Sequence, residues 1–179
     1  MRGSVDNNQN MDDYPEVATG ERRTLEQFLD FHRAAVVRTL DDLTDAEAAA
    51  PVLPATELTV GGIVKHLAAV EDLWFSHKLL DVPSAQPWRS APFDQDPDWE
   101  FHSAADNSVD EVRALYLSSC EASRRITARV DSLDVRAVRG SFGGQLVSLR
   151  WIYLHMIEET AQHRGHIDLL MDAIVQARQ

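Results

Sequence analysis

The segment from Ser148 to Ile174 constrains the fold more than any other part of the chain, because apolar residues recur along it every three or four positions. Residues spaced in this way lie on one face of an α-helix, so the segment predicts a long helix that packs against a core. The stripe consists of Leu149, Ile152, Met156, Glu159, His163, Ile167, Leu170 and Ile174. Glu159 and His163 stand where the pattern favours apolar residues, and an unpaired carboxylate buried there costs several kcal/mol. The fold must therefore compensate this charge.

Similar spacing predicts three earlier helices. They cover about residues 21–42, 59–80 and 108–131. Capping residues mark two of the starts: Thr59 precedes the second helix, and Ser108 followed by Glu111 has the spacing of a capping box. Residues 135–142 are the one candidate for a strand, and their alternation of polar and apolar residues is weak.

The segment 81–105 differs from the helices on either side, because prolines alternate there with large aromatic residues. The prolines are Pro83, Pro87, Pro92 and Pro97, and the aromatic residues are Trp88, Phe93, Trp99 and Phe101. Proline interrupts a helix, whereas so many aromatic residues do not suit a solvated linker. We predict a non-helical crossover that packs over one end of the helices and takes part in function. The alternative is an aromatic clasp that only closes the core.

Four long helices joined by one long crossover predict an all-α fold, a four-helix bundle, in which sites are built from side chains that face one another. The length of 179 residues suits one domain, which we place at residues 21–179. Residues 1–20 are polar and contain no apolar run. We therefore expect a flexible N-terminal tail rather than a signal peptide, and a cytoplasmic location.

Charge, cysteine content and the absence of several motifs exclude some functions. The formal net charge is −12, which argues against binding to nucleic acid or to an anionic membrane surface. The single cysteine, Cys120, excludes an intramolecular disulfide and a cysteine-rich zinc site, and its apolar surroundings predict a small core residue. The chain also lacks a glycine-rich phosphate loop, a nucleophile elbow and an H-E-x-x-H motif.

A metal ion would compensate Glu159 and His163, which are one helical turn apart, but a site needs a third ligand. His66 is the best candidate, because it lies near the middle of the second predicted helix and on its inward stripe, which consists of Ile63, His66, Val70, Leu73 and His77. Two histidines and one carboxylate form the ligand set of catalytic zinc sites that keep one position open. Two alternatives stay open: His66 is a hydrogen-bonded core residue, or Glu159 pairs with Arg164 or Arg150 at a helix flank.

The remaining histidines are weaker candidates. His166, three residues after His163, is either a fourth ligand or a hydrogen-bond donor to the site. His155, four residues before Glu159, is interpreted as a hydrogen-bonded histidine or as one at the end of the bundle. The histidines without a partner visible in the sequence are His32, His77 and His102.

Three segments together resemble a known family. They are TVGGIVKHLAAVEDLWF, DPDWEFH and LRWIYLHMIEETAQHRGHIDLL. Over about residues 21–175 the chain resembles the DinB-like metalloprotein superfamily, within it the branch of mycothiol-dependent maleylpyruvate isomerases and mycothiol S-transferases. The resemblance implies a bundle of up-down-down-up topology that binds a divalent metal, zinc or alternatively nickel. It also allows a homodimer.

The resemblance implies that the metal ligands are His66, Glu159 and His163. Many superfamily members have His-x-x-x-His in the last helix, whereas the mycothiol branch has Glu-x-x-x-His, as this chain does. His166 matches a position that is frequently His or Gln and is not usually a ligand. No catalytic side chain beyond the three ligands is implied, and the residues that bind the rest of the thiol are not identified.

The function implied by the resemblance is that of a metal-dependent thiol S-transferase. Such an enzyme conjugates mycothiol, or a related low-molecular-weight thiol, to an electrophile through a metal-bound thiolate. Trp88 and Trp99 of the crossover would shape the pocket for the electrophile. Two alternatives stay open, because a fold does not fix a function. One is a metal-dependent hydrolase that uses metal-bound water, and the other is a non-enzymatic dimeric stress or binding protein with a structural metal.

Overall fold

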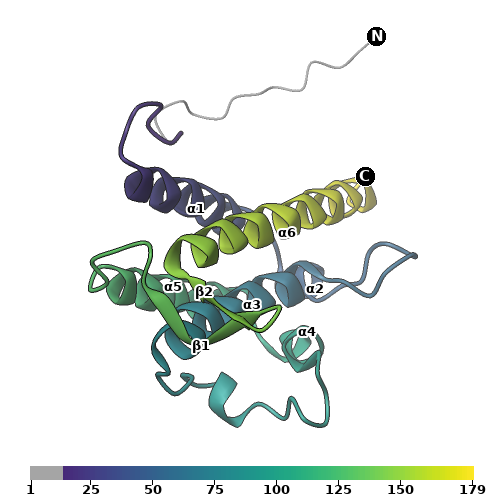
Figure 1. Ribbon diagram of the computed structural model, residues 1–179. Helices are drawn as coiled ribbons and strands as arrows, with labels where there is room; N and C mark the ends of the chain where they lie inside the picture. Colours follow the sequence, from purple (N-terminus) through teal and green to yellow (C-terminus); the bar gives the residue numbers. More distant parts are fainter. Residues whose placement is uncertain (1–13) are drawn as a thin grey trace.

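The computed structural model describes residues 14–179, and helices make up most of it (Figure 1). In chain order the helical elements are α1 (Glu21–Arg38), α2 (Asp45–Ala48), α3 (Val60–Glu71), the π-helical segment η2 (Asp72–Lys78), the 3-10 turn η3 (Trp88–Ser90), α4 (Trp99–His102), the 3-10 turn η4 (Ser103–Asp106), α5 (Val109–Thr127) and α6 (Leu149–Ala177). The strands β1 (Arg136–Phe142) and β2 (Gln145–Ser148) come between α5 and α6 in the chain. Within the described residues, no helix has both the length and the apolar character needed to cross a membrane. Most of the tail predicted at residues 1–20 lies outside the described residues.

The long helix α6 confirms the helix predicted from the apolar stripe. Its first free N–H groups are capped by Ser148, whose hydroxyl accepts a hydrogen bond from the backbone N–H of Trp151 at 3.2 Å. The six apolar members of the stripe are all at most 2% exposed. The third predicted helix begins as expected, with a capping box between Ser108 and Glu111.

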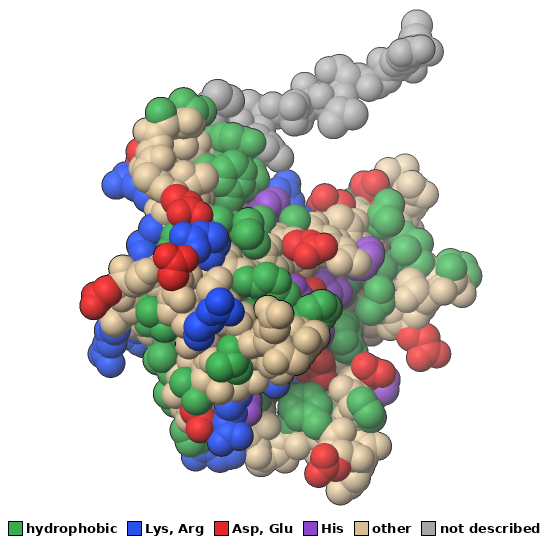
Figure 2. Space-filling model, in the orientation of Figure 1, with side chains coloured by type: hydrophobic (Ala, Val, Ile, Leu, Met, Phe, Trp, Pro, Cys, Tyr) green, Lys and Arg blue, Asp and Glu red, His purple; other side chains and the backbone are tan. Residues whose placement is uncertain are grey.

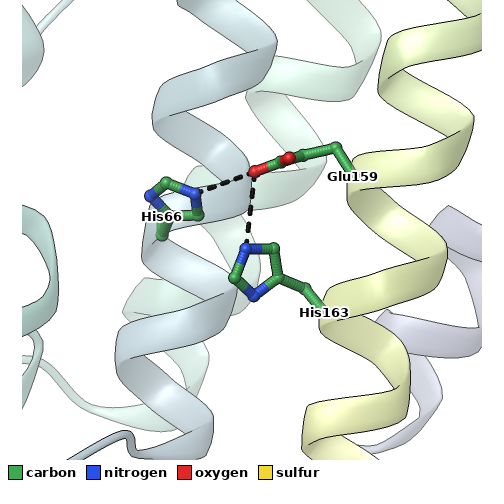
Figure 3. A group of neighbouring side chains, drawn as sticks. All are labelled: His66, Glu159 and His163. Carbon is green, nitrogen blue, oxygen red and sulfur yellow. Dashed lines mark hydrogen bonds and ion pairs between the residues drawn. The ribbon is translucent and has the colours of Figure 1, made fainter.

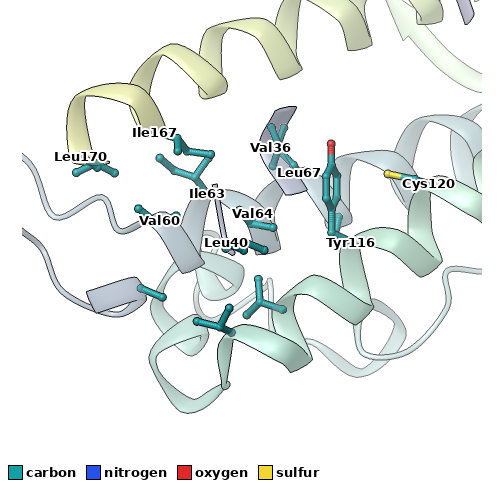
Figure 4. Close-up of a cluster of buried hydrophobic side chains, with 14 of the residues drawn as sticks. Val36, Leu40, Val60, Ile63, Val64, Leu67, Tyr116, Cys120, Ile167 and Leu170 are labelled. Carbon is teal, nitrogen blue, oxygen red and sulfur yellow. The ribbon is translucent and has the colours of Figure 1, made fainter. Parts of the chain in front are cut away.

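The helices pack around two clusters of apolar side chains. Helix α1 contacts α6 along its length, and α3 contacts both α5 and α6. The first core cluster is drawn in Figure 4 and includes Val36, Leu40, Ile63, Val64, Leu67, Tyr116, Cys120, Ile167 and Leu170. The second core cluster includes Leu25, Leu29, Phe75, Leu79, Ala137, Val147, Leu149, Ile152 and Met156. The second core cluster lies along the N-terminal parts of α1 and α6, and the first lies along their C-terminal parts. Polar side chains lie between the two clusters, and we call them the polar layer: Arg33, Glu71, Glu159 and His163.

The second predicted helix is α-helical only as far as Glu71 and continues as the π-helical segment η2. A π-helix bonds each N–H to a carbonyl five residues back, so it has more residues per turn and shifts the buried face. Leu73, which was expected to face inward, is therefore 38% exposed, whereas Phe75 and Leu79 are fully buried. The prediction for Leu73 is wrong for this reason.

A β-hairpin adds a small sheet to the predominantly helical fold. The weak strand candidate at residues 135–142 corresponds to β1, which pairs antiparallel with β2. Gly143 and Gly144 form the turn with φ angles of 57° and 79°, the positive values that a two-residue hairpin turn requires at both positions. The sheet has only two strands and leads directly into α6 (Figure 1).

The crossover contains three short helical segments, so the prediction of a non-helical segment is wrong. Proline is compatible with the first turn of a helix, and Pro87 directly precedes η3. The crossover is held on α3 by Lys65, whose ammonium donates hydrogen bonds to Ser103 and Asn107. Trp88 is 6% exposed and joins the first core cluster, as the aromatic clasp alternative describes.

A buried ion pair joins α1 to α3 in the polar layer. The Arg33 guanidinium donates to both carboxylate oxygens of Glu71, at 2.7 and 2.6 Å, and to Asp30 at 2.9 Å. Arg33 is 4% exposed and Glu71 is fully buried. Such a pair stabilises the fold only while both charges are present, because a lone buried charge is costly.

We expect Glu71→Leu to lower the free energy of unfolding by about 3 kcal/mol, because it leaves a buried guanidinium short of its main partner. The double variant Arg33→Met/Glu71→Leu should recover most of this loss, since neither charge then remains. Urea unfolding of the three proteins would measure the difference. Glu21→Gln is the control, because it breaks the exposed pair with Arg150 and should change stability little. If Glu71→Leu were as stable as the wild type, Glu71 would not be the main partner of the buried Arg33 guanidinium.

Candidate metal centre

The structure brings His66 of α3 together with Glu159 and His163 of α6 (Figure 3). Each residue offers one donor atom, and the three atoms all lie within 4.8 Å of one another. Their side chains are 17%, 20% and 15% exposed, respectively. They therefore stand at the rim of the core, and Figure 2 shows histidine and acidic side chains in a hollow below α6.

The spacing of the donor atoms suits a tetrahedral metal ion. Oε1 of Glu159 lies 3.1 Å from Nε2 of His66 and 3.4 Å from Nε2 of His163. Ligand atoms about 2.0–2.1 Å from a tetrahedral zinc ion lie about 3.3 Å from one another. Two imidazole nitrogens and one carboxylate oxygen are also a ligand set that zinc and nickel accept, with one position left for another ligand.

The hydrogen bonds of the His66 ring also favour a cation at this site. Its Nδ1 lies 2.9 Å from Oε1 of Glu100, and its Nε2 faces Glu159. A neutral imidazole has one N–H and can donate to only one of these carboxylates. Burial opposes a charge on the ring, but the hydrogen bonds with Glu100 and Glu159 outweigh it and raise the pKa of His66 to about 9. A cation between Nε2 and Glu159 would take the place of that second proton.

Charge compensation is also visible at Glu159. Hydrogen bonds from His163 and then from His66 hold the pKa of this carboxyl far below its usual range. The expected alternative partners are occupied elsewhere. Arg150 pairs with Glu21 and Asp134, and the Arg164 guanidinium lies over the ring of Phe31 at 5.6 Å. Among the described residues, neither arginine pairs with Glu159.

Glu100 is the site residue that sequence reasoning missed. It lies on α4, is 7% exposed, and brings its carboxylate to the side of His66 that faces away from Glu159. The adjacent Phe101 stacks on the His66 ring, with centroids 4.6 Å apart and planes 22° from parallel. A helix of four residues carries no periodic signal, so the only sequence clue was an acidic residue within the quoted DPDWEFH segment.

The other histidines and the crossover tryptophans have different surroundings. The rings of His163 and His166 are 5.3 Å apart, and among the described residues no side chain or backbone group hydrogen-bonds Nδ1 of either. His102 pairs with Asp96 on the surface, at 2.9 Å. Trp99, which is expected to shape a pocket, lies against the Lys65 ammonium, which is 4.7 Å from its ring centroid.

Cys120 confirms its prediction as a core residue. It is 2% exposed, and burial raises the pKa of its thiol. A neutral buried thiol is a poor nucleophile. Any thiol chemistry at the site must therefore use a sulfur atom that comes from outside the chain.

Comparison with known families gives a match over most of the chain. A family model described as Mycothiol-S-transferase matches residues 24–176, which include α1 from its first turn and nearly all of α6. Comparison with curated proteins finds no match. The matched range contains the three clustered side chains and Glu100.

The hydrogen bond between Glu100 and His66 generates a prediction about metal affinity. We expect Glu100→Ala to weaken zinc binding about 10- to 100-fold, because His66 loses the acceptor that fixes its Nδ1–H and orients its ring. Glu100→Gln keeps an acceptor oxygen and should give an intermediate affinity. Competition with a chromophoric chelator would measure both.

The matched control for Glu100 is Asp96→Asn. It removes the other histidine–carboxylate pair of the crossover, at exposed His102, and should leave zinc affinity unchanged. Equal affinity in Glu100→Ala and the wild type would show that Glu100 does not support the site.

Proposed function

The chain belongs to the mycothiol S-transferase family, and from this we propose that it is a metal-dependent thiol S-transferase. In this proposal it conjugates mycothiol, or a related low-molecular-weight thiol, to a small electrophile. The observation that carries the proposal is the cluster of His66, Glu159 and His163, with donor atoms within 4.8 Å, at the rim of the core. The buried thiol of Cys120 supports an external thiol as the nucleophile.

We propose that His66 and His163 bind the metal through Nε2 and that Glu159 binds it through Oε1. Zinc is the first choice and nickel the alternative. A bound divalent ion would act as a Lewis acid that lowers the pKa of a coordinated thiol toward neutrality. Together with one carboxylate it would leave about one net positive charge, which favours an anionic thiolate over the neutral thiol.

The residues around the ligands prepare them for this role. Glu100 accepts a hydrogen bond from the Nδ1–H of His66, which would leave Nε2, on the side of Glu159, as the nitrogen that binds the metal. Phe101 covers one face of the His66 ring and restricts its rotation. Lys65 anchors the segment that carries Glu100 and Phe101. The first ligand is therefore oriented before any metal or substrate arrives.

We also propose that α1, α3, α5 and α6 form the four-helix bundle of up-down-down-up topology implied by the family resemblance, as one domain at residues 21–179. The contacts of α1 with α6 and of α3 with α5 and α6 support this arrangement. The proposal includes a homodimer in the cytoplasm. Its partners are the small thiol and the electrophile, and not nucleic acid, in keeping with the charge of −12.

The ligand assignment is tested by Glu159→Gln. We expect this variant to fold but to lose zinc, because a neutral amide is a weak zinc ligand. Glu159→Leu should also lose zinc yet unfold at an equal or higher urea concentration, because an apolar side chain suits a position beside the core. Elemental analysis of the purified proteins measures the zinc. Glu158→Gln, at the exposed neighbouring position, is the control. Full zinc content in Glu159→Gln would make the assignment wrong.

The activity is tested with cobalt-substituted protein and mycothiol. We expect the thiol to produce a sulfur-to-cobalt charge-transfer band and to be consumed when an alkyl halide is added. No spectral change together with hydrolysis of p-nitrophenyl acetate in the absence of thiol would favour the hydrolase alternative. A protein that takes up neither zinc nor nickel, and whose melting temperature neither metal shifts, would leave the binding-protein alternative.

A further inference from the structure

Four aromatic rings from three elements form a continuous surface, which we call the aromatic wall: Trp74 of η2, Phe142 of β1, and Trp151 and His155 of α6. Trp151 stacks on His155 with centroids 5.0 Å apart and planes 20° from parallel. Trp74 lies 5.2 Å from Trp151 and 4.8 Å from His155, and Phe142 lies 5.8 Å from Trp151, between ring centroids.

The aromatic wall adjoins the metal centre along α6. Trp151, His155, Glu159 and His163 follow one another at intervals of four residues, so each side chain neighbours the next one on the helix surface. Side chains one turn apart on a helix are about 5–6 Å from each other at Cβ. The nearest ring of the wall, His155, is therefore one turn from Glu159. A molecule held at the metal centre must span about 6 Å of helix to reach His155 and about 12 Å to reach Trp151.

The exposure of the wall distinguishes it from a part of the core. Trp74 and Trp151 are partly buried and rest on the second core cluster, whereas Phe142 is 73% exposed. The positive φ angles of Gly143 and Gly144 fix the hairpin turn directly after Phe142. Phe142 therefore presents a large apolar ring to solvent at the end of β1, against Trp151, although burial would stabilise it.

We propose that the aromatic wall is the subsite for the electrophile, and that it binds an apolar ring carried by that molecule while the reacting carbon lies at the metal centre. This inference rests on the proposed transferase function. The wall offers ring faces, and the two arginines that line the pocket beside Phe142 and Trp151 already have partners: Arg150 pairs with Glu21 and Asp134, and Arg136 donates to the carbonyl of Leu146. The wall therefore recognises a flat apolar group by stacking rather than an anion by ion pairing. Such a subsite selects ring-bearing electrophiles over short aliphatic ones.

A matched pair of substrates isolates the contribution of the ring. The benzyl and methyl amides of 4-(2-chloroacetamido)butanoic acid have the same reacting carbon and differ only in the ring, and their chain is long enough to span the about 12 Å of helix between Glu159 and Trp151. In both, the thiol loses its proton to solvent, a sulfur–carbon bond forms, and the carbon–chlorine bond breaks with its electron pair leaving as chloride. The ratio of kcat/KM for the two compounds, with zinc-loaded protein and mycothiol, therefore reports the subsite.

We expect Phe142→Ala to lower this benzyl-to-methyl ratio about two- to tenfold, the usual range for one aromatic contact. Phe142→Ala/Trp151→Ala should lower it further. The KM for mycothiol and the zinc content should not change, because neither ring contacts the ligands. Val138→Ala is the control: Val138 is 57% exposed on the same strand but is not part of the wall. An unchanged ratio in Phe142→Ala would overturn the proposal.

Two further measurements separate the subsite from the transferase function. Unreactive N-benzylacetamide should quench tryptophan fluorescence in the wild type and less in Phe142→Ala, while N-methylacetamide should not. If no conjugation occurs but this quenching does, the ring-binding site stands and the transferase proposal fails. The absence of both conjugation and quenching overturns both proposals.

Sedimentation of Phe142→Ala tests whether a second copy of the chain binds to the aromatic wall instead of a substrate. Loss of a dimer with an unchanged substrate ratio would assign the wall to a subunit interface instead.

Discussion

The Glu159 carboxylate faces two imidazoles that belong to different helices, and this contact is possible at only one register of α3 against α6. Nε2 of His66 must reach the same oxygen that faces His163, which leaves little freedom in the spacing or the axial register of the two helices. The apolar residues of α6 on either side of this contact hold that register. Residues before Glu159 enter the second core cluster, and residues after His163 enter the first.

The polar layer between the two core clusters extends beyond the metal centre. In α1, Arg33 falls between Leu29 of the second cluster and Val36 of the first, and its partner Glu71 closes the α-helical part of α3. Sliding either helix by one turn, about 5.4 Å, would place a buried charge among apolar side chains. The cost of an uncompensated charge is several kcal/mol, so the layer selects one register, whereas two purely apolar faces would tolerate several.

Periodicity allowed prediction of those parts of the structure in which one helix face repeats over several turns. The stripe of α6 and the capping box at Ser108 belong to this group, and so does the candidate cluster, since Glu159 and His163 were out of place on a regular face. Features without a repeat escaped prediction. The hairpin depends on two glycines and a strand with poor alternation, η2 changes the helical period, and Glu100 reaches His66 from a four-residue helix. Arg33 and Glu71 are 38 residues apart, and nothing local indicates that each is buried.

The residues of the proposed site divide between the bundle and its insertions. The three candidate ligands come from α3 and α6, whereas Glu100 and Phe101 come from the crossover and Phe142 comes from the hairpin. The proposed metal chemistry depends on the register of two packed helices, which many core contacts hold. The side chains around the ligands, by contrast, belong to short segments that a few contacts anchor, such as the hydrogen bonds of Lys65. Such segments can change in sequence without moving the ligands, so this fold can keep one activated thiol and vary the electrophile that it accepts.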